Sequence, residues 1–239
     1  DMSITHNIEL VRERIAAAAT AAGRDPEAVT LMLAAKHQPL ANLVEAAQAG
    51  ATTFGHNVVQ QLQESTAGMR EAGFTTTNTV IGPVQSNKLR AAMDNADRID
   101  TVDSLKTATR IARRQEARIS EGLAQGPYPI LIQVNSSGAT TQSGCHPDHL
   151  LNLAEGILEL DLVRIDGLMT IGANTSDEGR IHESFALTRA LSEAMRERLG
   201  LAAATELSMG MTGDLEIAIA EGSTMVRVGT AVFGQRPRP

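Results

Sequence analysis

Apolar positions along the chain alternate between two spacings, one typical of helices and one typical of strands. The opening segment has apolar residues at helical spacing from Ile4 to Ile15 and ends near residues 23–26. It predicts a helix before the first strand, placed to cover the floor of a barrel. The clearest later helix lies between residues 181 and 199, where apolar side chains from Ile181 to Leu199 share one face.

Eight short apolar runs between the helical segments predict strands. They cover residues 29–35, 52–54, 78–81, 98–102, 130–134, 165–169, 206–208 and 225–228. Strands that alternate with helices are typical of parallel sheets with crossover connections, and 239 residues is close to the usual size of an eight-stranded barrel. The pattern predicts an α/β fold, a (β/α)8 TIM-type barrel with an extra N-terminal helix, as one domain over residues 1–239.

Composition and charge narrow the classes of partner. The net charge is −7, aromatic residues make up 2% and tryptophan is absent, which argues against a nucleic-acid surface. The single cysteine, Cys145, excludes an intramolecular disulfide and is typical of a reducing compartment. Residues 1–7 lack the apolar core of a secretion signal, and no run has the length of a membrane span. We therefore expect a cytoplasmic protein that binds neither nucleic acid nor membranes.

Metal binding has little support in the sequence. The segment from Cys145 to His149 contains possible ligands, but it lacks a fourth and is more typical of a helix cap. We expect no metal site.

The ends of the last two predicted strands indicate a phosphorylated ligand. Residues 206–214 and 222–234 each join a short strand to a turn of small residues rich in backbone amides. The last two strands of such barrels often hold a phosphate in this way. Candidate phosphate partners are the Ser208 hydroxyl, the backbone near Gly229 and the amide and hydroxyl of Thr230.

Lys36 directly follows the first apolar strand, where catalytic groups of barrels lie. The low-dielectric barrel wall would favour a neutral amine that can act as a nucleophile and form an imine. A lysine that merely begins a solvated loop is the alternative.

Strand alternation directs Arg227 into the barrel, because Val226 and Val228 suit the helix layer. A guanidinium in that position must be paired or face a ligand. A buried ion pair with Asp166 or Glu206 explains the pattern equally well.

Several segments resemble one family when they are taken together and in order. They are the run that ends at Lys36, FGHN at 54–57 with 59–60, IGPVQSNK at 81–88, QVN at 133–135, SG at 143–144, GLM at 167–169 and the two segments with small turns. The chain resembles the pyridoxal phosphate homeostasis proteins, also described as alanine-racemase-like proteins that have only the N-terminal domain.

The resemblance implies pyridoxal 5′-phosphate (PLP) as cofactor, held as an internal aldimine on Lys36 in a fold type III barrel. The residues implied for the cofactor are Lys36, Asn57, Ile81, Met169, Ser208, Met209, Arg227, Gly229 and Thr230. Asn57 would lie beside the ring, Ile81 and Met169 would flank it, and Arg227 would approach the pyridine nitrogen. Simpler roles stay open, with Ile81 and Met169 as core, Asn57 as a helix cap and Ser208 in a turn.

An arginine at the pyridine nitrogen only donates a hydrogen bond, which predicts weak carbanion stabilisation. We therefore expect intracellular PLP homeostasis without strong catalysis, with apo-enzymes that use PLP as possible recipients and a monomeric barrel.

Two rival activities share the lysine. A PLP-dependent racemase of low activity would need a second acid/base group, and the one tyrosine, Tyr128, precedes the fifth strand at the opposite face. A cofactor-free Schiff-base lyase would use Lys36 and the phosphate site on a sugar phosphate.

Three departures from the family pattern bear on the chemistry. His56 stands where glutamate is common, Gln142 where lysine is frequent, and Ala35 where a small hydroxyl residue is usual. They put in doubt a carboxylate relay at position 56 and a second anion contact at position 142.

Overall fold

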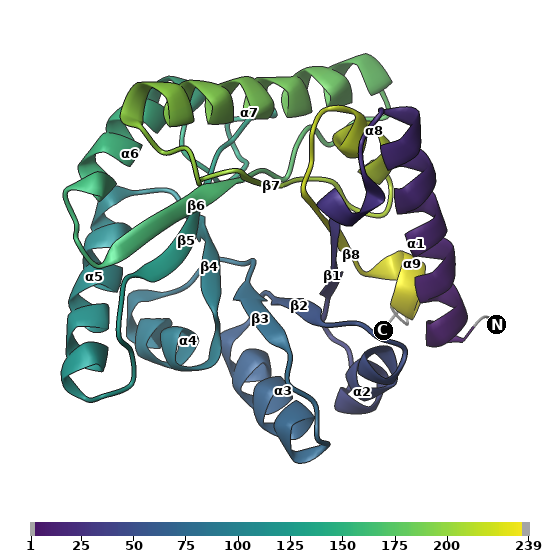
Figure 1. Ribbon diagram of the computed structural model, residues 1–239, viewed down its shortest axis with the longest axis horizontal. Coiled ribbons are helices and arrows are strands. Elements are labelled where there is room, and N and C mark those ends of the chain that lie inside the picture. Colours follow the sequence, from purple (N-terminus) through teal and green to yellow (C-terminus); the bar gives the residue numbers. More distant parts are fainter. Residues whose placement is uncertain (1–2, 236–239) are drawn as a thin grey trace.

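A closed barrel of eight parallel strands in chain order forms the centre of the molecule (Figure 1). The computed structural model describes residues 3–235. The strands are β1 Thr30–Ala34, β2 Thr53–His56, β3 Thr77–Val80, β4 Arg98–Val102, β5 Tyr128–Gln133, β6 Val163–Met169, β7 Glu206–Ser208 and β8 Met225–Val228. β8 pairs with β1, with Met32 opposite Arg227, which closes the barrel. The predicted (β/α)8 class is confirmed.

Helices surround the barrel and connect its strands (Figure 1). They are α1 Ile4–Ala21, α2 Leu40–Gln48, α3 Val59–Glu71, α4 Leu89–Asn95, α5 Leu105–Ser120, α6 Leu150–Leu158, α7 Glu178–Leu199, α8 Leu215–Ala220 and α9 Thr230–Phe233, with 3-10 turns η1 Pro26–Ala28, η2 Ser86–Lys88 and η3 Pro147–His149. The longest, α7, starts where the Asp177 carboxylate accepts from the Gly179 and Arg180 amides, and it ends at Gly200 in the left-handed region at φ 68°. Over the described residues 3–235, no helix is both long and apolar enough to cross a membrane.

The opening helix lies in the outer ring and not across the barrel floor, so that expectation was wrong. Figure 1 shows α1 beside α8 and α9. Its buried residues Ile8, Val11 and Ile15 pack in one cluster with the outward residues of β1 and β8. Because α9 has only four residues, it is too short to cover these two strands, and α1 fills that place.

All strand bounds agree with the predicted ones within two residues; β2, β5 and β6 differ by two residues at one end, and the differences in β2 and β5 have clear reasons. β2 continues through Gly55 and His56, because these residues pair with Thr79 and Val80 of β3. β5 begins at Tyr128, where it pairs with Val163 of β6. Both extensions depend on pairing with a neighbouring strand, which local propensity does not reveal.

Candidate functional site

A cavity of about 370 Å³ opens at the carboxyl ends of the strands. Its lining residues are Ala34, Lys36, Asn57, Ile81, Met169, Ile171, Met211, Thr212, Gly213, Arg227, Gly229 and Thr230. They come from the ends of β1, β6 and β8, from the loops that follow the strands and from the start of α9. The structure thus brings Lys36, Arg227 and the turn after β8 to one cavity, at the face where barrels of this type carry chemistry.

Lys36 lies two residues beyond the end of β1. It lies an even number of residues from Met32 and Ala34, so it continues the same face of the strand, and Ala34 also lines the cavity. The side chain is exposed, so the barrel wall does not enclose it. The chain turns directly after it, where the Gln38 amide donates to the Ala35 carbonyl at 3.0 Å and His37 has φ 62°. A positive φ at a residue other than glycine is uncommon, and such strain often accompanies functional sites.

The loops after β7 and β8 present unpaired backbone donors at the cavity. The N–H groups of Thr212, Gly213 and Gly229 donate no hydrogen bond to another described residue. Gly210 lets the first loop turn, because it has φ 101° and a Cβ there would approach the Ala218 Cβ to 2.6 Å. Converging free N–H groups form an anion-binding concavity, so this end of the cavity suits a phosphate.

Ser208 and Met209 do not line the cavity. The Ser208 hydroxyl accepts a hydrogen bond from Arg227 Nη1 at 2.8 Å. The Met209 side chain is fully buried in the apolar core, and its N–H donates to the Met225 carbonyl. Ser208 can therefore act on a ligand through Arg227, whereas Met209 offers no free polar group to one.

Arg227 points into the barrel and is almost fully buried, with 5% of its surface exposed. Its Nη2 donates to the Thr170 carbonyl at 3.0 Å, and its Nη1 donates to the Ser208 hydroxyl. Burial lowers the pKa of the guanidinium, while Asp100 and Asp214 oppose that shift. Both of its hydrogen-bond partners are neutral. These two bonds use two of the five N–H donors of the guanidinium, so donors remain for an acceptor in the cavity.

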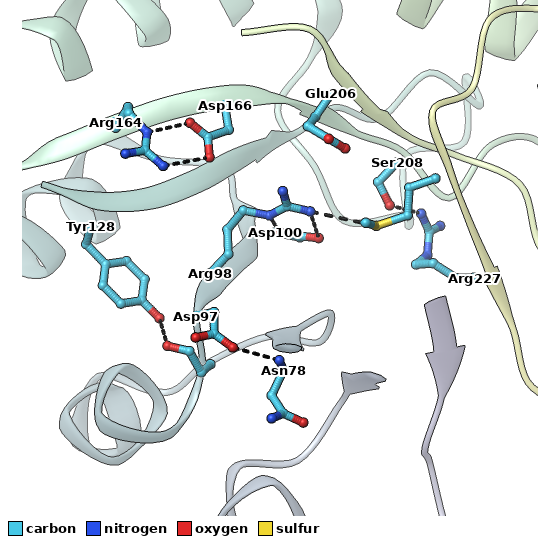
Figure 2. A network of polar contacts seen from close by, with 12 residues as sticks. Asn78, Asp97, Arg98, Asp100, Tyr128, Arg164, Asp166, Glu206, Ser208 and Arg227 are labelled. Atoms are coloured by element: carbon cyan, nitrogen blue, oxygen red, sulfur yellow. Dashed lines mark hydrogen bonds and ion pairs between the residues drawn. The ribbon is translucent and has the colours of Figure 1, made fainter. Parts of the chain in front are cut away.

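The carboxylates that might have paired with Arg227 have other partners, and Figure 2 shows this for Asp166. Asp166 accepts from Arg164 Nε at 2.7 Å, and Glu206 accepts from the Thr224 hydroxyl at 3.2 Å. The predicted alternative of an ion pair with Asp166 or Glu206 is therefore not what the structure contains.

A buried ion pair lies deeper in the barrel beside Arg227 (Figure 2). Asp100 is fully buried and accepts from Arg98 Nε at 2.6 Å. Burial raises the pKa of Asp100, and the charges of Arg98 and Arg227 oppose this rise. Asp100 thus lies within reach of the charges of both guanidinium groups, while Glu206 and Asp166 also act on Arg98 and Asp214 acts on Arg227.

Two glycines let the loops after β2 and β3 approach each other at the cavity. A Cβ on Gly82 would lie 2.6 Å from the Asn57 carbonyl oxygen, and one on Gly55 would lie 2.8 Å from Ile81 Cδ1. The N-cap residue of α3 is Val58, and no side chain caps that helix. Asn57 is therefore held at the cavity by close packing and has no capping role.

Several other residues of the sequence analysis lie away from the cavity. Tyr128 is buried, donates to the Ala96 carbonyl at 2.7 Å and has a pKa raised by burial. His56 is buried with Nε2 3.2 Å from Asn78 Oδ1, and Gln142 Nε2 donates to the Gly172 carbonyl at 2.9 Å. These contacts are structural.

The Cys145–His149 segment also has structural contacts. His146 Nδ1 accepts from the Asp148 amide at the start of η3, and burial raises the pKa of Cys145 to about 11. Over residues 3–235, no three His, Cys, Asp or Glu side chains gather as metal ligands would.

The structure adds lining residues that the sequence analysis did not single out. Ala34 and Ile171 lie two residues from Lys36 and Met169, respectively. Strand alternation was the signal that could have found them, because residues two apart share a face. Met211, Thr212 and Gly213 fall within the segment recognised as a phosphate-binding turn, but none had been assigned a contact.

Comparison with known proteins gives a consistent result. The family model of the alanine racemase N-terminal domain matches residues 2–237. A curated relative from Pseudomonas aeruginosa, named pyridoxal phosphate homeostasis protein, is 40% identical over 98% of this chain and 96% of its own length.

Two solved structures extend the comparison. PipY of Synechococcus elongatus, solved with PLP bound, is 31% identical and has a TM-score of 0.79 over 94% of this chain and all of its own. An alanine racemase from Clostridium difficile is 16% identical, with a TM-score of 0.73 over 99% of this chain and 57% of its own, and shows likeness of fold alone.

Proposed function

We propose a function from the premise that this chain belongs to the alanine racemase N-terminal domain family and, within it, to the pyridoxal phosphate homeostasis proteins. It binds PLP at the cavity bordered by Lys36 and Arg227 and carries it as a Schiff base on Lys36. The role is intracellular PLP homeostasis, without strong catalytic activity of its own. The relative PipY, which was solved with PLP bound, supports the choice of ligand.

One observation carries the proposal, namely that an amine, a guanidinium and free backbone N–H groups border one cavity. Lys36 supplies the nucleophile that can hold an aldehyde carbon. The N–H groups of Thr212, Gly213 and Gly229 suit a phosphate dianion. The residues present therefore fit PLP, whose aldehyde and phosphate ester lie on neighbouring carbons of one flat ring, with the ring nitrogen opposite the aldehyde.

The expectation of weak catalysis rests on what the cavity contains. PLP supplies an electron sink when it is bound, and a donor-only partner such as Arg227 at the ring nitrogen would weaken that sink. Among the described lining residues, Lys36 and Arg227 are the only titratable side chains. A racemase needs a second acid/base group on the other face of its ligand, and Tyr128 is buried away from the cavity.

We also propose that the protein is a cytoplasmic monomer that hands PLP to apo-enzymes. The closed barrel supports a monomer, because it leaves no unpaired strand edge for a partner. The exposed position of Lys36 supports transfer, because a recipient molecule can reach the amine.

The test is covalent trapping of PLP on a defined lysine. The purified protein is incubated with PLP, reduced with borohydride and digested, and the modified peptide is identified by mass spectrometry. We expect modification at Lys36 and a visible absorption band that Lys36→Ala abolishes. Lys106→Ala is the matched control, since Lys106 is an exposed lysine on α5 outside the cavity. Modification only at Lys106 or Lys88 would refute the assignment.

A further inference from the structure

A second cavity of about 240 Å³ adjoins the proposed cofactor cavity. Asn57, Ile81 and Ile171 line both, so the two spaces share a wall. Besides Asn57, the polar residues of the second cavity are Thr101, Asp103, Thr107, Gln133 and Ser143. Its volume is far above the roughly 10–15 Å³ that a single water needs, so it has room for a small molecule.

Gln133 is the buried polar residue among those that line this cavity, and its side chain lacks a partner. Only 3% of its surface is exposed, yet its side-chain amide makes no hydrogen bond to another described residue. By contrast, the Thr101 hydroxyl donates to the Gly82 carbonyl at 2.8 Å. A largely buried amide is more stable when a partner satisfies its donors and its acceptor. Gln133 therefore points to a ligand that both accepts and donates hydrogen bonds.

Strand β5 turns Gln133 inward, into the second cavity. Ile130 and Ile132 belong to the apolar core between barrel and helices, so alternation turns Gln133 inward. Gln133 pairs in register with Met169 of β6, which lines the cofactor cavity. A molecule held by Gln133 therefore lies in a cavity that shares a wall with the one that Lys36 borders.

Charge selects among small ligands. Asp103 is the only charged side chain among the described residues that line this second cavity. One of its oxygens accepts from the Gly144 amide at 3.3 Å, which leaves the other free. Although Asp103 is exposed, its carboxylate at this cavity repels a ligand carboxylate and attracts a ligand cation.

We propose that this second cavity is an acceptor site for a small primary amine without a carboxylate, of the short-diamine class, which removes the cofactor from Lys36. The inference rests on the proposed function. One nitrogen, protonated, pairs with Asp103, and Gln133 hydrogen-bonds the chain end nearer the cofactor. The other nitrogen, neutral, adds to the carbon that Lys36 Nζ holds.

The step balances without an oxidant or a reductant. A carbon–nitrogen double bond forms to the incoming amine, and the one to Lys36 breaks. Lys36 Nζ takes the protons that the incoming nitrogen loses and leaves as a free amine. The carrier thus returns to its unloaded state, and the cofactor departs on a small molecule.

Three amines of equal chain length test the charge preference: 1,3-diaminopropane, 3-aminopropanol and β-alanine. Loaded protein is titrated with each, and the fraction still attached to Lys36 is read by borohydride trapping and mass spectrometry. Each midpoint is divided by the same amine's midpoint with free PLP, which removes intrinsic reactivity. We expect the diamine to act at a concentration at least about tenfold below that of β-alanine, with aminopropanol between them.

Variants then test the two side chains. Asp103→Asn should remove the advantage of the diamine over aminopropanol, and Gln133→Leu should weaken release by all three amines. Asp148→Asn is the matched control, because this exposed carboxylate lies outside the cavity. Equal release by β-alanine, or an unchanged preference in Asp103→Asn, would overturn the inference. Failure of the proposed function is distinct, since no adduct would then form on Lys36 before any amine is added.

Discussion

The hydrogen bond from Arg227 to Ser208 holds a buried guanidinium in one orientation. We predict that Ser208→Ala lowers the free energy of unfolding by about 1–3 kcal/mol, because a buried donor loses its acceptor. Urea denaturation without PLP measures this value. Ser176→Ala is the control, since Ser176 is exposed. A loss no larger than that of the control would mean that Arg227 finds another acceptor.

His56 gives the stability a dependence on pH. The ring is buried, with Nε2 against Asn78 Oδ1 and with Nδ1 unpartnered among the described residues. Burial lowers its pKa below the ordinary 6.5, and the Asn78 contact only partly opposes this shift. The unfolded chain therefore binds a proton at a higher pH than the folded chain does. The stabilisation is present above pH 6.5 and is lost as the pH falls through the folded pKa.

We predict that unfolding free energy falls between pH 7.5 and 5.5 by up to about 1.4 kcal/mol for each pH unit below the unfolded pKa. Urea denaturation at several pH values measures the slope. His56→Gln should flatten it, whereas His146→Gln, which changes an exposed ring, should not. An equal slope in wild type and His56→Gln would show that another group carries the effect.

The alternation of side chains along the strands predicted which chemistry-bearing residues face the cavity. It did not predict what surrounds those residues. Lys36 and Arg227 lie at the cavity because each shares the inward face of its strand. The exposure of Lys36 and the neutral partners of Arg227 could not be predicted, since they depend on loops and on β6 and β7, far along the chain. Gln133 was noticed only within a matching segment, because nothing local reveals that its amide lacks a partner.

At the scale of elements, the contact between the β2–α3 and β3–η2 loops sets the position of Asn57. We predict that Gly82→Ala weakens PLP binding by about tenfold or more, because its Cβ would approach the Asn57 carbonyl oxygen to 2.6 Å and Asn57 Cα to 2.9 Å. Absorbance titration with PLP measures the affinity. Gly126→Ala is the matched control, since a Cβ there meets no atom within 4 Å. Unchanged affinity would show that the Asn57 loop shifts without consequence for the ligand.

The elements themselves were predictable to the extent that their patterns are local. β4, β7 and β8 have the expected bounds, because their apolar runs end at polar or glycine residues. The extension of β2 through Gly55 and His56 was missed, since glycine is a poor strand former and the extension depends on β3. The place of α1 was missed because it follows from the shortness of α9, at the other end of the chain.

At the scale of the molecule, α1 closes the ring of helices over β8 and β1. Its buried face consists of Ile8, Val11, Ile15 and Ala19. Arg14 Nε also contacts Glu216 of α8 at 2.7 Å, where both side chains are partly exposed, so the salt bridge adds little to the stability of the fold.

Ile8→Ala should lower the free energy of unfolding by about 2–5 kcal/mol, as for other buried large apolar residues. Leu10→Ala on the same helix, 38% exposed, is the control for urea denaturation. Equal losses would mean that α1 does not seal the barrel.

The same closure predicts a monomer. Every strand of the barrel pairs on both sides, so no edge is open to a second copy. The exposed large apolar side chains are spread from Leu10 on α1 to Met211 after β7, and scattered residues of this kind are normal for a monomer surface. Light scattering after size exclusion should give about the chain mass of 25.3 kDa with and without PLP. A mass of twice that value in both states would contradict the prediction. Doubling only with PLP would instead place the interface at the cavity mouth, because Lys36 and the loops around it are the parts that the ligand touches.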